Sequence, residues 1–260
     1  MTRWNSFAFI AILLGECIFS RSIGAQPASS QRGAAAGTLR TVLANAALPS
    51  VVDVPRYFKA MKISVPAKHS TTYNGAVGFV FVLSGVLELT IGAERQLLRR
   101  GDANLVTGNT SMTLKANGSG PAAFLLLVLL SADELNKPMV GLPAVVTELY
   151  RTKSPIPGLK PGPYEFTLVR VTLPPRMPTN APHHRSGAAM YYIFDGTGMF
   201  TANGKTEPKT SGSIHYEPYD LVHQWANPGD KPLVLIQANI SQEGVPAVIF
   251  APEAGTSAVK

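Results

Sequence analysis

The chain has 260 residues and a formal net charge of +7, from 23 basic and 16 acidic side chains. The basic residues are scattered, without a basic helix or a ladder of aromatic residues, which argues against a nucleic-acid partner. With 23 glycines, 21 prolines and only 15% charged residues, the composition is typical of many short strands joined by turns. We therefore expect a mildly cationic all-β protein whose partner is a small molecule, with anions favoured.

The N-terminus has the pattern of an export signal. Arg3 precedes an apolar run over 7–14, and residues 23–25 provide a cleavage site. The run is too short to cross a bilayer, which needs about 20 residues. We predict a signal peptide over residues 1–25, export to the periplasm or the medium, and no membrane span in the mature chain; an uncleaved anchor is the alternative. Cleavage would remove Cys17, the single cysteine.

Short strand-like runs follow a small, polar segment over 26–45, which we expect to be a flexible lead-in. Glycines and polar clusters separate these runs, as in a protein built from hairpins. The expected strands are 61–65, 78–83, 87–91, 96–98 and 122–130 in the first half, and 166–173, 190–194, 199–202 and 233–240 in the second. Residues 124–130 are apolar throughout, which indicates a strand covered on both faces or a buried helical segment. Ser131 then opens one or two helical turns.

A proline-rich stretch divides the chain. Residues 151–163 contain four prolines, which cannot donate hydrogen bonds to a strand ladder and so make a stiff connector. We predict a first domain over 46–140, a linker over 141–163, a second domain over 164–252 and a frayed tail over 253–260.

An internal repeat relates the two halves. A shift of 111 residues superimposes turn glycines and a loop proline, namely Gly85 on Gly196, Gly101 on Gly212 and Pro121 on Pro232. The same shift aligns the strands at 79–83 and 190–194. A chance alignment of glycines is the alternative, but one constant offset that fits turns and strands together predicts one all-β unit used twice. Upstream of these strands the register slips, so the connecting loops should differ.

The most specific motif runs from Gly212 to Asn227. It has Pro218, Asp220, His223 and Asn227 at the spacing of the second cupin motif, G(X)5PXG(X)2H(X)3N, with aspartate in place of the glycine. Aspartate tolerates the left-handed conformation of such a turn because its side chain bonds the local backbone. This half thus resembles the cupins, which are jelly-roll barrels. Together with the repeat, the resemblance implies an all-β bicupin, two tandem jelly-roll β-barrels.

The first cupin motif, G(X)5HXH(X)3-4E(X)6G, is incomplete. Counting back from Gly196, its first histidine falls on His183 and its second on Arg185, while Ala189 stands at the glutamate position. A shift of one residue would make His184 the second ligand. Adjacent residues point in opposite directions on a strand, so at most one of the two histidines should face inward.

The resemblance implies a metal site in the second barrel. A cupin site typically has three histidines and a carboxylate, and His183, His184 and His223 would hold one divalent transition metal such as Mn, Fe, Ni, Cu or Zn. Arg185 and Glu217 are the candidate catalytic residues, with Arg185 pairing a substrate carboxylate. A metal-free polar pocket is the alternative.

The first half lacks these groups. Thr72, Asn74, Gly78 and Met112 stand at the matching offsets, so we expect no metal in the first barrel. Two functions follow from the resemblance. One is a metal-dependent oxygenase, isomerase or decarboxylase acting on a small organic acid or carbonyl compound; the other is a non-catalytic small-molecule-binding or structural cupin with a vestigial metal site. A homodimer is expected by analogy with cupins.

Overall fold

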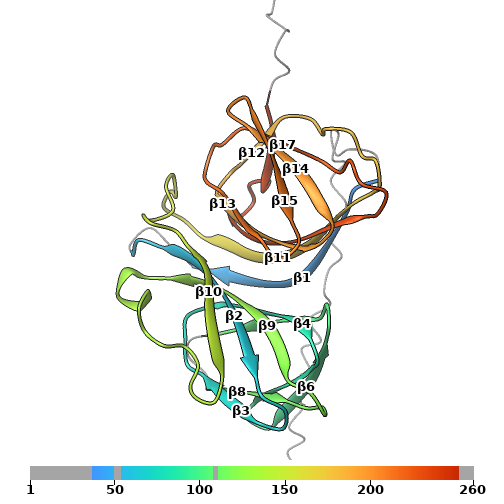
Figure 1. The fold of residues 1–260 in the computed structure, drawn as a ribbon. Coiled ribbons are helices and arrows are strands. Elements are labelled where there is room, and N and C mark those ends of the chain that lie inside the picture. Colours follow the sequence, from blue (N-terminus) through green and yellow to red (C-terminus); the bar gives the residue numbers. More distant parts are fainter. Residues whose placement is uncertain (1–36, 50–53, 108–110, 252–260) are drawn as a thin grey trace, which may run out of the picture. The chain divides into compact units, whose positions relative to one another are not determined.

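A computed structural model describes residues 37–49, 54–107 and 111–251 (Figure 1). These residues form antiparallel strands arranged as two barrels of two sheets each, so the predicted tandem barrels are confirmed. One 3-10 turn, η1 (Ala132–Glu134), follows Ser131 as expected. In this part of the chain no helix has the length and apolarity to span a membrane. The predicted signal peptide over 1–25 and the tail over 253–260 lie outside the described residues.

The first barrel has sheets in the orders β10-β2-β9-β4-β7 and β3-β8-β5-β6. Its strands are β2 (Tyr57–Val65), β3 (Ser70–Tyr73), β4 (Gly78–Ser84), β5 (Val86–Ile91), β6 (Glu94–Arg99), β7 (Ala103–Val106), β8 (Met112–Ala116), β9 (Ala122–Leu130) and β10 (Val145–Arg151). Each run predicted in this half lies within one of these strands. Residues 124–130 belong to β9, so of the two expected alternatives this stretch is a strand and not a helical segment.

The second barrel has sheets in the orders β1-β11-β18-β13-β16 and β15-β14-β17-β12-β19. Its strands are β1 (Leu39–Leu48), β11 (Tyr164–Leu173), β12 (His183–Arg185), β13 (Ala188–Asp195), β14 (Thr197–Ala202), β15 (Lys205–Thr210), β16 (Ile214–Glu217), β17 (His223–Ala226), β18 (Leu233–Gln242) and β19 (Val248–Phe250). The four runs predicted in this half are confirmed.

The repeat is visible in the strand bounds. Shifting β5, β6 and β7 by 111 residues gives the bounds of β14, β15 and β16. A β-bulge between Val82 and Ser84 recurs between Ile193 and Asp195, where the same strands pair. The two barrels therefore share one strand register, including its irregularity.

Two edge strands are exchanged with respect to the sequence. β1 precedes the first barrel in the chain but pairs with β11 of the second, and Figure 1 shows the two side by side in blue and yellow. β10 precedes the second barrel in the chain but pairs with β2 of the first. The expected flexible lead-in is therefore wrong for residues 39–45, and the expected linker is wrong for residues 145–151. β1 is rich in alanine, a residue of low strand propensity, and its pairing with β11 overrides that preference.

An apolar core joins the two large sheets. Phe58, Phe79 and Phe166 lie in it, with the ring centroids of Phe79 and Phe166 4.5 Å apart. The side chains of β9 alternate between this core and the interior of the first barrel. Cover on both faces explains why β9 is apolar at every position from 124 to 130.

Candidate functional site

The inner face of β18 changes from apolar to polar along the second barrel. Leu233 and Leu235 belong to the apolar core of this barrel, whereas Gln237, Asn239 and Ser241 are buried on the same face of the strand. The side-chain amide of Gln237 donates to Asn239 at 3.4 Å, and that of Asn239 donates to Ser241 at 3.4 Å. These are long hydrogen bonds, so the polar groups of this row are only weakly engaged with one another.

Glu217 is the fully buried acid of this interior. Its Oε2 accepts a hydrogen bond from Nε of Arg185 at 2.8 Å, and its Oε1 accepts one from Nε1 of Trp225 at 2.9 Å. Burial alone would raise the pKa of Glu217, but Arg185, His223 and these hydrogen bonds outweigh burial and hold the pKa well below its usual range. Glu217 is therefore ionised at neutral pH, which suits the anchoring of a cation better than proton transfer.

Arg185 is 1% exposed and lies on β12. Nε donates to Glu217, Nη2 donates to the hydroxyl of Tyr191, and Nη1 has no hydrogen-bond partner. Burial would lower the pKa of Arg185, but Tyr191 and Glu217 outweigh burial and raise it. A permanently charged group is thus buried with donor protons unsatisfied, an arrangement that is unfavourable unless a ligand completes it.

His183 and His223 lie side by side on paired strands, with ring centroids 4.3 Å apart and ring planes tilted by 58°. Nδ1 of His183 donates to the carbonyl of Ala181 at 2.9 Å, and Nδ1 of His223 donates to that of Leu221 at 2.8 Å. Nε2 of His223 is 2.9 Å from Oε1 of Glu217, close enough for an ion pair although it lacks hydrogen-bond geometry. The structure therefore brings two of the three predicted metal ligands together.

Burial keeps two histidines of this barrel neutral. Burial, together with the neighbouring His223 and Arg185, lowers the pKa of His183 to about 4. Burial likewise lowers the pKa of His215 to about 4. His215 packs against Phe200, with ring centroids 3.9 Å apart. At neutral pH these two rings contribute polarity but no charge.

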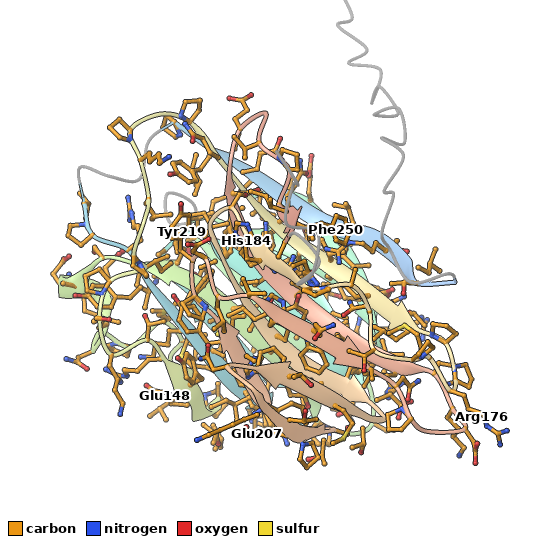
Figure 2. The ribbon with its side chains drawn as sticks, turned by 90° about the horizontal axis from the view of Figure 1, so that it is seen from above. Glu148, Arg176, His184, Glu207, Tyr219 and Phe250 are labelled. Carbon is orange, nitrogen blue, oxygen red and sulfur yellow. The ribbon has the colours of Figure 1, made fainter. Side chains whose placement is uncertain are left out.

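His184, the third predicted ligand, faces away from this cluster. Its Nδ1 lies 3.0 Å from Oδ1 of Asp220. Figure 2 shows His184 between Tyr219 and Phe250. Asp220 has a φ of 62°, which confirms that aspartate adopts the left-handed conformation of the motif glycine. As expected from strand geometry, only one of the two adjacent histidines points inward.

These side chains, as placed, do not fit a divalent metal ion. In the described ranges no three His, Cys, Asp or Glu side chains are grouped so as to hold one. Glu217, the carboxylate beside His223, already neutralises Arg185, and a metal ion there would be repelled by the guanidinium. Arg185 occupies the position of a histidine ligand in the first cupin motif. In this barrel the guanidinium of Arg185, and not a metal ion, is therefore the cation beside the carboxylate of Glu217.

Sequence reasoning missed Arg40 and the polar row of β18. Nη2 of Arg40 donates to Oε1 of Gln237 at 2.8 Å, and this brings β1 into the site. The polar row had a signal, because polar residues alternate with apolar ones at 237, 239 and 241. Arg40 had none, since its place depends on the exchange of β1 between barrels.

Comparisons with known proteins agree with this architecture. Residues 169–239 match the family model of the cupin domain. This match lies in the second barrel, and the chain as a whole has the two-barrel cupin fold that the motifs predicted. The structure of AerE from Microcystis aeruginosa is similar to this chain, with a TM-score of 0.51 and 18% identity over 75% of this chain and 98% of that chain.

A variant of salicylate 1,2-dioxygenase from Pseudoaminobacter salicylatoxidans has a TM-score of 0.49 and 12% identity over 76% of this chain and 81% of that chain. The same variant in complex with gentisate has a TM-score of 0.49 and 12% identity over 71% and 68%. No curated protein sequence matches this chain significantly. At these identities the likeness describes the fold and leaves the activity to be argued from the side chains.

Proposed function

We propose that the second barrel binds a small organic anion through Arg185, without a divalent metal. The observation that carries this proposal is Nη1 of Arg185, a buried guanidinium nitrogen without a partner. Buried polar groups are nearly always hydrogen-bonded, so a bare donor on a charged side chain indicates a missing acceptor. A carboxylate is the acceptor whose planar geometry matches a guanidinium best.

The neighbouring residues suit such a ligand. Glu217 and Tyr191 bond two of the three guanidinium nitrogens, which fixes the orientation of the third. The amides of Gln237 and Asn239 offer hydrogen bonds to uncharged parts of the ligand. Glu217 acts in this proposal as a positioning residue for Arg185. The first barrel, with an apolar interior, stabilises the fold.

Export is part of the proposal, as is a homodimer formed through edge strands. N-terminal sequencing of secreted protein should begin after residue 25, and light scattering should give the mass of two chains. A retained N-terminus would contradict export, and a monomeric mass would contradict the homodimer. Neither result would bear on the binding site.

Isothermal titration calorimetry tests the binding itself. Purified full chain is titrated with acetate, benzoate and succinate at pH 7, before and after dialysis against EDTA. We expect binding that is insensitive to EDTA and about tenfold or more weaker in Arg185→Lys, which keeps the charge but loses the planar fork. Arg95→Gln, an exposed change on β6, is the control for loss of one positive charge. Absence of binding, or equal binding by Arg185→Lys, would contradict the proposal.

The competing function is a metal-dependent oxygenase, isomerase or decarboxylase. One observation favours it: Nδ1 of both His183 and His223 donates to a backbone carbonyl, which orients Nε2 as in metal-binding histidines. Such a site would require Glu217 to leave Arg185. Elemental analysis of purified protein decides, because near-stoichiometric transition metal that is lost in His223→Ala would favour the enzyme.

A further inference from the structure

The side chains that enter the second barrel carry more positive than negative charge. Glu217 is the one fully buried acid among the residues that the structure describes, and it is bonded to Arg185. Arg40 enters the same interior, and the ion pairs formed by the described side chains of this barrel leave it without an acidic partner. At least one positive charge is therefore uncompensated, which favours anionic ligands.

His223 also lies against Glu217. One of its ring nitrogens faces the carbonyl oxygen of Leu221 at 2.8 Å and the other faces Oε1 of Glu217 at 2.9 Å. Glu217 is therefore occupied by Arg185 and His223, and Arg40 forms no ion pair with an acidic side chain among the described residues.

Arg40 reaches the interior from β1. It lies opposite Val171 of β11, whose side chain belongs to the core of the second barrel, so the arginine shares this inward face. Partial burial lowers the pKa of Arg40 and the charge of Arg185 lowers it further, as expected for two guanidiniums that lie near each other.

The two arginines are attached to neighbouring positions of the sheet. Arg185 is bonded to Tyr191, and Arg40 is bonded to Gln237. Tyr191 and Gln237 are direct cross-strand partners on β13 and β18. The Cα atoms of such partners are about 5 Å apart, so a short ligand can reach from one guanidinium to the other.

We infer that the site takes a small dicarboxylate, with one end bound by Arg185 and the other by Arg40. This inference rests on the proposed function and adds the ligand class and a second binding residue. It gives the exchange of β1 a functional consequence, because the binding site of the second barrel requires a residue from the other end of the sequence.

A matched pair of ligands tests the inference. Succinate and its monomethyl ester have similar size but differ by one negative charge. Titration calorimetry of the full chain at pH 7 should show that succinate binds roughly ten- to hundredfold more tightly, the value of one charge-assisted hydrogen bond. In Arg40→Gln the affinity for succinate should fall to about that for the ester. Arg40 is partly exposed, so this change is compatible with folding, and thermal unfolding of the variant verifies it.

The outcomes distinguish the dicarboxylate inference from the proposed anion site. The inference is overturned when wild type binds succinate and ester equally, or when Arg40→Gln keeps the preference for succinate. In either case, weaker binding of both ligands by Arg185→Lys still supports the proposed anion site. If wild type binds no carboxylate at all, the inference and the proposed function fail together. Arg95→Gln should keep the full preference, and a loss there would show a general charge effect that overturns the role of Arg40.

Discussion

The two barrels share a backbone register but differ in their interiors. At a shift of 111 residues, the polar groups of the second barrel correspond to apolar ones in the first, with Glu217 on Val106, His223 on Met112, Gln237 on Leu126, Asn239 on Val128 and Ser241 on Leu130. All five apolar counterparts are buried in the core of the first barrel. The fold therefore does not require a polar interior. Buried polar groups reduce stability, and the first barrel folds with apolar residues at the same positions. The polar groups of the second barrel are therefore evidence of a binding site.

The exchanged strands extend this comparison to the edges of the sheets. Arg40 of β1 lies opposite Val171, and Val146 of β10 lies opposite Ile63. Val171 and Ile63 are equivalent, because they pair with residues of β18 and β9 that are 111 positions apart. Arg40 thus replaces an apolar residue of the twin barrel, as Glu217 does. The same contrast appears on two elements far apart in sequence.

The largest effect should come from converting Glu217 into its counterpart. Glu217→Val leaves Arg185 buried without a counter-ion, and we expect the free energy of unfolding to fall by about 3–5 kcal/mol. The double variant Glu217→Val with Arg185→Leu should recover most of this loss, because it makes the interior apolar like that of the first barrel. Urea unfolding of the three proteins measures both values. A single variant within about 1 kcal/mol of wild type would show that the pair is not buried as described.

Removal of Asn227 should have the next largest effect. Its side-chain amide donates to the backbone carbonyls of Leu173, Pro174 and Lys231, which ties two loops together. Asn227→Ala leaves these carbonyls unsatisfied and should cost about 2 kcal/mol in urea unfolding. The exposed Asn117→Ala serves as control and should change stability by less than about 0.5 kcal/mol. Equal effects of the two changes would show that the hydrogen bonds of Asn227 do not stabilise the fold.

The pH dependence of stability should come from the second barrel. The pKa of His183 is lowered from 6.5 to about 4 in the folded state, so below pH 6.5 the unfolded chain takes up a proton that the folded chain does not. The free energy of unfolding should therefore fall by about 2 kcal/mol for this group between pH 7 and pH 5. The lowered pKa of Glu217 does not enter this window, because its contribution is lost only below its ordinary value of 4.5.

His183→Gln isolates this contribution. Its urea midpoint should change less between pH 7 and pH 5 than that of wild type, while the remaining slope reports His215, whose pKa is also lowered to about 4. An unchanged slope would mean that His183 is exposed to solvent. The twin barrel has Thr72 at the matching offset, so it offers no equivalent titration.

The smallest effect is expected at Asp220. Its φ of 62° is accessible to glycine without strain, and its contact with His184 is on an exposed carboxylate. Asp220→Gly should therefore change the free energy of unfolding by no more than about 1 kcal/mol in either direction. Asp220→Val, which adds a β-branched side chain at a left-handed position, should cost about 1–2 kcal/mol more. Similar stability of the two variants would argue against the left-handed conformation.

The turns and the register could be predicted from the sequence, because glycines, a proline and a motif recur at one offset. Arg185 and Glu217 were each candidates, but their ion pair was not predictable. The two residues are 32 positions apart, and they meet only because β12 and β16 lie in facing sheets of the barrel. The place of Arg40 in the site was not predictable either, because the local sequence pattern carries no information about which barrel an edge strand joins.

The most direct test is a crystal structure of the full chain grown with succinate. The account predicts a carboxylate within hydrogen-bond distance of Nη1 of Arg185, with Nε of Arg185 still bonded to Glu217. A metal ion bound to Nε2 of His183 and His223, with Arg185 turned away from Glu217, would contradict it.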